Sequence, residues 1–135
     1  MNRVREDEPL TFWEALNIEE ERRRKALPFQ ERVFSYLDRG LYAEQSRRLL
    51  TYFPRDQILF LKSKTLRNQP QSVMDRIFEY LGLTPIPVQV QKEIHSGDYQ
   101  NPMTLQERDF LLEFYRPEIH ALEKLLGWDC SEWLE

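Results

Sequence analysis

The feature that most constrains this fold is a run of four consecutive apolar residues, Ile58 to Leu61, in the stretch RDQILFLKSKTL. A Phe53-Pro54 pair precedes the run, and polar lysines follow it. A short apolar run bounded in this way predicts a β-strand near residues 57–62 that is buried on both faces. Strands of that kind occur mainly inside parallel sheets covered by helices on both sides. Such a strand needs neighbouring strands, and the rest of the chain offers almost none.

The N-terminal third of the chain predicts two helices. Thr11 and Glu14 form a capping-box pattern, so we expect a helix from residue 12 to residue 27, just before a proline. A second helix is predicted over residues 42–53, where apolar residues recur at steps of three and four until Pro54 ends the pattern.

The remaining helices lie after the predicted strand. Pro70 suits the first position of a helix with the clearest apolar stripe in the sequence, and Gly82 suits its end. Thr104 begins another helix, which Pro117 either kinks or divides in two and which Gly127 ends. Between them, the prolines of TPIPVQV exclude helix and allow at most a short edge strand over residues 87–91. The chain is therefore predicted to be mostly α-helical.

Composition bounds the class of protein. With 41% hydrophobic and 31% charged residues, the 135-residue chain is typical of a water-soluble globular domain. It contains no apolar run near the roughly 20 residues that cross a bilayer, and its N-terminus is too charged for a signal peptide, so we expect a cytoplasmic location. Cys130 is the only cysteine, and the two histidines stand in different elements, which argues against a metal site.

A basic cluster at residues 22–25 raises the possibility of nucleic-acid binding. Three glutamates, residues 19–21, stand four positions before Arg23, Arg24 and Lys25, in the order that favours ion pairs on a helix. The net charge of −4 also disfavours nucleic acid as the main partner. A solvated helix face is therefore the preferred interpretation of the cluster.

Two longer segments carry a family resemblance. RGLYAEQSRRLLTYFPRDQILFLKSKTLRNQPQSVMDRIFEYLGL, residues 39–83, resembles the second half of sulfotransferases that use 3′-phosphoadenosine-5′-phosphosulfate (PAPS). SGDYQNPMTLQERDFLLEFYRP, residues 96–117, resembles the closing segment of bacterial and polysaccharide-modifying members. The resemblance extends from Phe12 to the C-terminus.

The resemblance implies an α/β fold of the P-loop-kinase-like sulfotransferase type, in which a parallel sheet binds PAPS and no metal is needed. It implies transfer of a sulfuryl group to a hydroxyl or amine acceptor. The phosphosulfate loop, the general base and the ligands of the 3′-phosphate are expected before Met1, so no catalytic residue is assigned within the chain. Residues 1–135 are thus expected to form a single partial domain, the C-terminal half.

Two expectations about partners follow from the resemblance. The strand near residues 57–62 would be completed by an N-terminal half or by a second copy of the chain across its edge, and without that half the chain is expected to be inactive. The alternative is a catalytically silent helical interaction domain derived from the same scaffold.

The resemblance also places a nucleotide-binding loop after the third helix. The loop maps onto His95, Ser96, Gly97, Asp98 and Tyr99. Gly97 can adopt a positive φ that turns successive N–H groups toward an anion, and the two hydroxyl side chains add donors. The Lys-Gly of many relatives is absent here, which leaves His95 and the more distant Lys92 as the cationic groups. The alternative for this segment is a simple Asx turn.

Three residues near the second helix are candidates for the acceptor side of the resembling domain: Tyr36, Arg39 and Tyr42. Aromatic residues at a helix start more often belong to the core, so the alternative is a packing role. Lys64 stands where the relatives usually carry an acidic residue, which is a departure from the family pattern.

Overall fold

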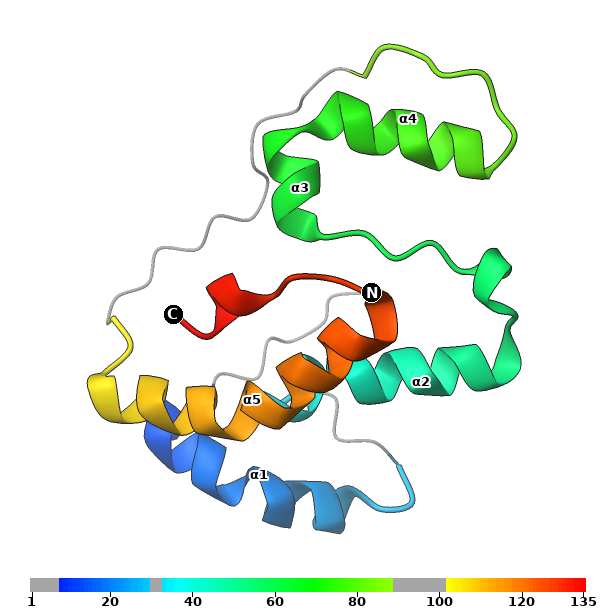
Figure 1. Ribbon diagram of the computed structural model, residues 1–135. Helices are drawn as coiled ribbons and strands as arrows, with labels where there is room; N and C mark the ends of the chain where they lie inside the picture. The colour runs from blue at the N-terminus through cyan, green and yellow to red at the C-terminus, as the bar shows by residue number, and fades with distance from the viewer. Residues whose placement is uncertain (1–7, 30–32, 89–101) are drawn as a thin grey trace. The chain divides into compact units, whose positions relative to one another are not determined.

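The computed structural model describes residues 8–29, 33–88 and 102–135 (Figure 1). These residues form five α-helices and three short 3₁₀ helices, and no β-strand occurs among them. In chain order the elements are α1 (Phe12–Ala26), η1 (Asp38–Gly40), α2 (Tyr42–Tyr52), η2 (Arg55–Gln57), α3 (Ser63–Asn68), α4 (Pro70–Tyr80), α5 (Leu105–Leu126) and η3 (Ser131–Trp133).

Both predicted capping boxes are confirmed. At the start of α1, the backbone N–H of Glu14 donates to Thr11 Oγ1 at 3.3 Å, and the Thr11 N–H donates to the Glu14 carboxylate at 2.9 Å. Thr104 and Glu107 repeat this arrangement at the start of α5, with distances of 3.3 and 2.7 Å. Each box satisfies backbone donors that the first turn of a helix leaves without partners.

The substitution Thr104→Ala should destabilise the protein by about 1 kcal/mol, because it removes the side-chain acceptor of an N-cap. Thr104→Ser keeps the hydroxyl and serves as the matched control. The free energy of unfolding from urea titration measures both variants. Equal losses for alanine and serine would contradict a capping role.

The helix ends also follow the predictions, and the structure decides the alternative at Pro117. Helix α5 runs continuously through Pro117 and stops at Gly127, whose φ of 67° is left-handed. Helix α4 ends with paired bonds from the N–H of Gly82 to the Glu79 carbonyl and from the N–H of Leu83 to the Phe78 carbonyl, at 3.0 and 2.8 Å. This pair of bonds is a Schellman motif.

The structure does not show the predicted buried strand near residues 57–62. Residues 55–57 form a 3₁₀ turn, and the backbone is extended at Ile58 (φ −127°, ψ 119°) and again at Lys62 (φ −83°, ψ 125°). The segment 58–62 is half-buried, and no strand among the described residues pairs with it. An extended apolar segment becomes a strand only when a neighbour accepts and donates its backbone hydrogen bonds. The described part of the chain supplies no such neighbour.

Two further differences concern the segments around α4. The short helix α3 follows the extended segment directly and was not predicted. Of the predicted edge strand over 87–91, residues 87 and 88 form no strand, and residues 89–91 lie outside the described residues.

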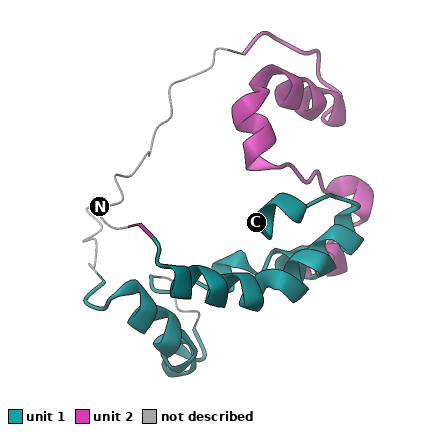
Figure 2. Cartoon of the chain, turned by 60° about the vertical axis from the view of Figure 1, so that its left-hand side comes forward, with its two compact units in different colours: residues 1–47, 103–135 teal, residues 48–102 magenta. Residues whose placement is uncertain are grey.

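The chain divides into two compact units, and the division falls within α2 (Figure 2). Unit 1 comprises residues 1–47 and 103–135, and unit 2 comprises residues 48–102. Within unit 1, α1 lies beside α5, and the rings of Trp13 and Phe110 meet edge to face with centroids 5.5 Å apart (Figure 1). The buried apolar residues of unit 1 are Ala15, Leu16, Ala43, Ile119, Leu122 and Cys130.

Unit 2 is smaller, and α3 packs against α4 within it. Val73 of α4 is buried. The side chain of Gln71 fixes the segment that follows α4: its amide donates to the Ile86 carbonyl at 3.1 Å and accepts from the Val88 N–H at 2.8 Å. Of the helices described in either unit, none has the length and apolar content needed to cross a bilayer.

Candidate functional site

The residues predicted to contact the nucleotide, His95, Ser96, Gly97, Asp98 and Tyr99, lie outside the described residues, as does Lys92. The candidate site that the structure describes is therefore in unit 1. It consists of the turn formed by residues 35–40, called here the 35–40 turn, and of a cavity beside it.

A buried carboxylate holds the 35–40 turn. Glu19 lies on the inner face of α1, and only 4% of the residue is exposed. Its oxygens accept hydrogen bonds from the backbone N–H groups of Tyr36 (2.7 Å), Leu37 (2.8 and 3.0 Å) and Asp38 (2.9 Å). Three backbone donors of half-buried residues thus share one acceptor group. The carboxylate replaces the regular secondary structure that this turn lacks.

Tyr115 of α5 holds the other side of the turn. Its hydroxyl donates to the carbonyls of Leu37 and Tyr36 at 2.9 and 3.3 Å. Burial, with a smaller contribution from the charge of Glu19, raises the pKa of Tyr115 to about 12, so the hydroxyl stays protonated as a donor. The ring occupies the space beside Gly40: a Cβ on that residue would lie 2.5 Å from the ring and hydroxyl atoms. The turn requires glycine there because the tyrosine fills the available room.

A third set of contacts anchors Tyr36. The Arg22 guanidinium forms a two-pronged ion pair with Glu8 at 2.7 and 2.9 Å and lies over the ring of Phe34. The Tyr36 hydroxyl donates to the same Glu8 carboxylate at 2.9 Å, and its ring meets Phe12 edge to face. Tyr36 is therefore a packing residue, as the alternative interpretation of the sequence proposed.

The ion pair makes part of the stability dependent on pH. The hydrogen bond from Arg22, helped by the one from Tyr36, lowers the pKa of Glu8 from 4.5 to about 2. The unfolded chain therefore binds a proton at higher pH than the folded chain, and the stability from this pair is lost as pH falls from about 4.5 to about 2.

We expect Glu8→Gln to flatten the fall in the free energy of unfolding over that acidic range, relative to the unsubstituted protein. Urea titrations at several pH values measure the effect. Glu21→Gln is the control: the hydrogen bond from Lys25 lowers the pKa of that carboxylate too, but the pair is exposed, so the slope should change less than for Glu8→Gln. If the free energy of unfolding falls with pH at the same slope in Glu8→Gln and in the unsubstituted protein, the ion pair of Glu8 and Arg22 does not cause the pH dependence.

The basic cluster of α1 is largely a solvated helix face, as predicted. Glu20 pairs with Arg24 at 2.9 Å and with Arg23 at 2.5 Å, and Glu21 pairs with Lys25. Arg22 is the exception, because it points to Glu8. The neighbouring Glu19, for which the spacing suggested an ion pair, instead turns inward to the 35–40 turn.

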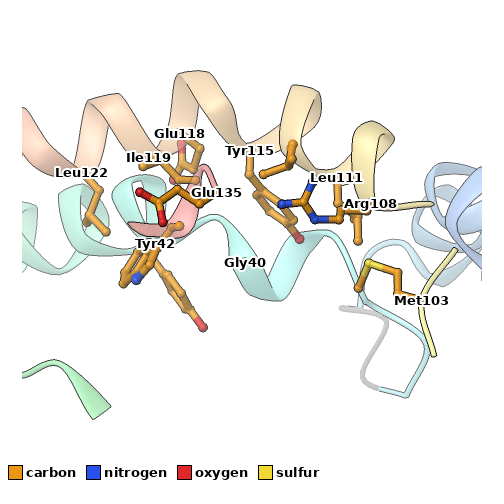
Figure 3. Close-up of a pocket in the computed structure, with 12 residues that line it drawn as sticks. Gly40, Tyr42, Met103, Arg108, Leu111, Tyr115, Glu118, Ile119, Leu122 and Glu135 are labelled. Carbon is orange, nitrogen blue, oxygen red and sulfur yellow. The ribbon is translucent and has the colours of Figure 1, made fainter. Parts of the chain in front are cut away.

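Beside the turn lies a cavity of about 570 Å³ (Figure 3). One wall is a stripe of α5, and Gly40, Tyr42 and the C-terminal segment form the opposite side (Figure 3). The lining residues are Gly40, Tyr42, Met103, Arg108, Leu111, Leu112, Tyr115, Glu118, Ile119, Leu122, Trp133 and Glu135. Of the acceptor-side candidates, Tyr42 lines this cavity, whereas Tyr36 and Arg39 do not.

The chemistry of the cavity suits binding better than bond making. Its wall is mostly apolar. Glu118, one of its acidic groups, already accepts a hydrogen bond from the backbone N–H of Glu44 at 2.9 Å. In the part of the chain that the structure describes, no three histidine, cysteine or acidic side chains come together in a way that could hold a metal ion. A cavity of this size and composition resembles sites that bind small molecules.

Comparisons with known proteins agree with the resemblance read from the sequence. Residues 10–109 match the family model for the sulfotransferase domain. The bifunctional heparan sulfate N-deacetylase/N-sulfotransferase 4 of Mus musculus is 30% identical over 120 residues, which cover 70% of this chain and 14% of that protein. The membrane-associated sulfotransferase kil1 of Dictyostelium discoideum is 26% identical over 97 residues, covering 72% of this chain and 20% of that protein.

A solved structure is also similar. The crystal structure of a sulfotransferase from Alicyclobacillus acidocaldarius matches with a TM-score of 0.77 and 30% identity, and the match covers 95% of this chain and 47% of that one. The chain thus spans about half of this structural neighbour and a much smaller share of the two curated relatives. Because the family model covers most of the chain and the fold matches as well, the chain belongs to the sulfotransferase family.

Proposed function

We propose that this chain forms part of an enzyme that transfers a sulfuryl group from PAPS to a hydroxyl or amine acceptor. The observation that carries the proposal is the match of residues 10–109 to the sulfotransferase domain. The likeness to a solved bacterial sulfotransferase over 95% of the chain supports it. The α/β fold with a parallel sheet that the resemblance implies is part of the same proposal.

In this reaction the acceptor oxygen or nitrogen attacks sulfur, the bond from sulfur to the phosphate oxygen breaks, and the acceptor proton passes to a base. Adenosine 3′,5′-bisphosphate leaves. The 135 residues contain only four scattered glycines and no Gly-rich, Lys-containing phosphate loop. The groups that hold the phosphosulfate and the base are therefore assigned to residues outside these 135.

The contribution proposed for this chain is the loop of His95, Ser96, Gly97, Asp98 and Tyr99, which would contact the nucleotide through backbone N–H groups and hydroxyls. A thermal-shift titration with adenosine 3′,5′-bisphosphate tests it. A ligand that binds only the folded protein, at a free concentration a hundredfold above its dissociation constant, stabilises the protein by about 2.7 kcal/mol. Gly97→Val should abolish the stabilisation, and Gln100→Ala is the control in the same segment.

The extended segment 58–62 is the proposed contact with the rest of the enzyme. Its backbone is extended at Ile58 and at Lys62, the segment is half-buried, and no strand of the described residues pairs with it. We propose that a strand of the phosphate-loop half, or of a second copy of this chain, pairs there and satisfies its backbone groups. Size-exclusion chromatography with and without such a half tests the pairing. A monomer that never associates would contradict it.

The alternative is a catalytically silent helical interaction domain. It is favoured by the mostly apolar wall of the described cavity, where one acidic side chain is already engaged as a hydrogen-bond acceptor. Absence of any stabilisation by millimolar adenosine 3′,5′-bisphosphate, even with a phosphate-loop half present, would favour this alternative. A cytoplasmic location stays a prediction, and one of the relatives is named as membrane-associated.

A further inference from the structure

The shape of the unit 1 cavity indicates an elongated ligand. The lining residues of α5 recur at steps of three and four, which places them on one face of the helix. From Arg108 to Leu122 this face is about 21 Å long, at a rise of about 1.5 Å per residue. The opposite side carries the aromatic rings of Tyr42 and Trp133, whose centroids lie 6.4 Å apart in an edge-to-face contact. A narrow apolar body can lie between these two surfaces.

The cavity is open to solvent although its wall is apolar. Tyr42 is 52% exposed and Met103 is 54% exposed, and both contribute to the lining. When a ligand covers large apolar side chains in a concave, accessible site, apolar surface is removed from water and the free energy of the system falls. Exposed apolar side chains of this kind therefore favour ligand binding. The volume of about 570 Å³ lies within the range of about 300 to 1,000 Å³ that small-molecule sites occupy.

The charges of the cavity are separated along α5. Arg108 lies at the end near Met103, in the first turn of the helix (Figure 3). Among the described residues no ion pair to Arg108 is found. The Thr104 and Glu107 capping box already satisfies donors of this helix start, so the guanidinium supplies the positive charge at this end of the cavity. Glu118 lies ten residues further on, about 15 Å along the axis, and Glu135 also lines the cavity. An anionic group is therefore favoured only at the Arg108 end.

We propose that this cavity binds an amphipathic small molecule with an apolar body and one anionic group, and that Arg108 holds the anionic group. The body lies along the Leu111–Leu122 face, against Tyr42 and Trp133. The inference goes beyond sulfuryl transfer, because it concerns binding to unit 1 alone and requires neither the sulfuryl donor nor the nucleotide loop.

Isothermal titration calorimetry of the full chain with two probes of the same shape tests the proposal. One probe is octane-1-sulfonate, which is an anion, and the other is octane-1-sulfonamide, which is uncharged at neutral pH; both have a long, narrow apolar body like that of the proposed ligand. We expect the sulfonate to bind at least about tenfold more tightly, because a hydrogen bond to a charged group contributes enough for such a factor. Equal affinities for the two probes would overturn the role of Arg108, and no binding of either would overturn the site.

Two variants and a control locate the site. Arg108→Gln should weaken sulfonate binding about tenfold and leave sulfonamide binding unchanged. Leu112→Trp, which fills the cavity, should weaken both probes. Arg116→Gln removes an exposed arginine of the same helix that does not line the cavity, so it should change neither affinity. An Arg116 effect equal to that of Arg108 would show that binding follows net charge and would overturn the proposal.

Discussion

Replacing Glu19 by alanine should destabilise unit 1 by about 3 to 5 kcal/mol. Three backbone N–H groups of the 35–40 turn donate to this one buried carboxylate. Each unsatisfied buried donor costs about 1 to 3 kcal/mol. The three donating residues are half-buried, so the loss should lie toward the lower end of the sum for three donors. Glu19→Gln keeps an acceptor oxygen but sets an amide N–H₂ against the donors, so its loss should be intermediate.

The matched control for Glu19 is Glu21, which lies on the exposed face of the same helix with 65% of its side chain accessible. Glu21→Ala should leave the free energy of unfolding essentially unchanged. Urea titration followed by circular dichroism measures all three variants. If Glu19→Ala and Glu21→Ala cost the same, the carboxylate does not hold the turn.

Introducing a methyl group at Gly40 should cost about 2 kcal/mol. The new Cβ would lie 2.5 Å from the Tyr115 ring, so the ring or the turn must move, and overpacking of this kind costs about 1 to 3 kcal/mol. The smaller conformational freedom of alanine in the unfolded chain offsets part of this loss, by about 0.4 to 1 kcal/mol. Because Tyr115 also donates to the turn, a displaced ring would weaken those hydrogen bonds as well.

A double-mutant cycle identifies the cause of the Gly40 effect. In a Tyr115→Leu background the space beside Gly40 is free, so Gly40→Ala should cost much less there. Gly127→Ala is the control: that glycine has a φ of 67° and nothing within 4 Å of its Cβ position, so its cost comes from backbone strain. The Gly127 cost should be the same in both backgrounds. A Gly40 cost that does not depend on Tyr115 would contradict the steric account.

The helices could be predicted because their signals are local. The Thr11 and Thr104 capping boxes and the glycine ends at Gly82 and Gly127 involve residues within one or two turns of each other, and the structure reproduces all four. The segment 58–62 shows the opposite case. Its extended backbone follows from local sequence, but a β-strand also needs a hydrogen-bonded neighbour, which can lie anywhere in the sequence or in another chain.

The candidate site was harder to predict for a similar reason. The spacing of Glu19 to Arg23 suggested a surface ion pair, whereas the carboxylate is buried and binds a turn 17 to 19 residues away. A signal was present, since Glu19 follows the buried Ala15 and Leu16 at steps of four and three and so shares their apolar face. The cavity of unit 1 combines residues from the turn, α5 and the C-terminal segment, and no local pattern links these.

The central claim is that this chain acts as part of a PAPS-dependent sulfotransferase, and a chimera tests it most directly. This chain would replace the segment that it matches in the Alicyclobacillus sulfotransferase, a match with a TM-score of 0.77 that covers 47% of that protein. Adenosine 3′,5′-bisphosphate at a hundredfold over its dissociation constant should stabilise the folded chimera by about 2.7 kcal/mol. A cooperatively folded chimera that millimolar nucleotide does not stabilise would contradict the claim.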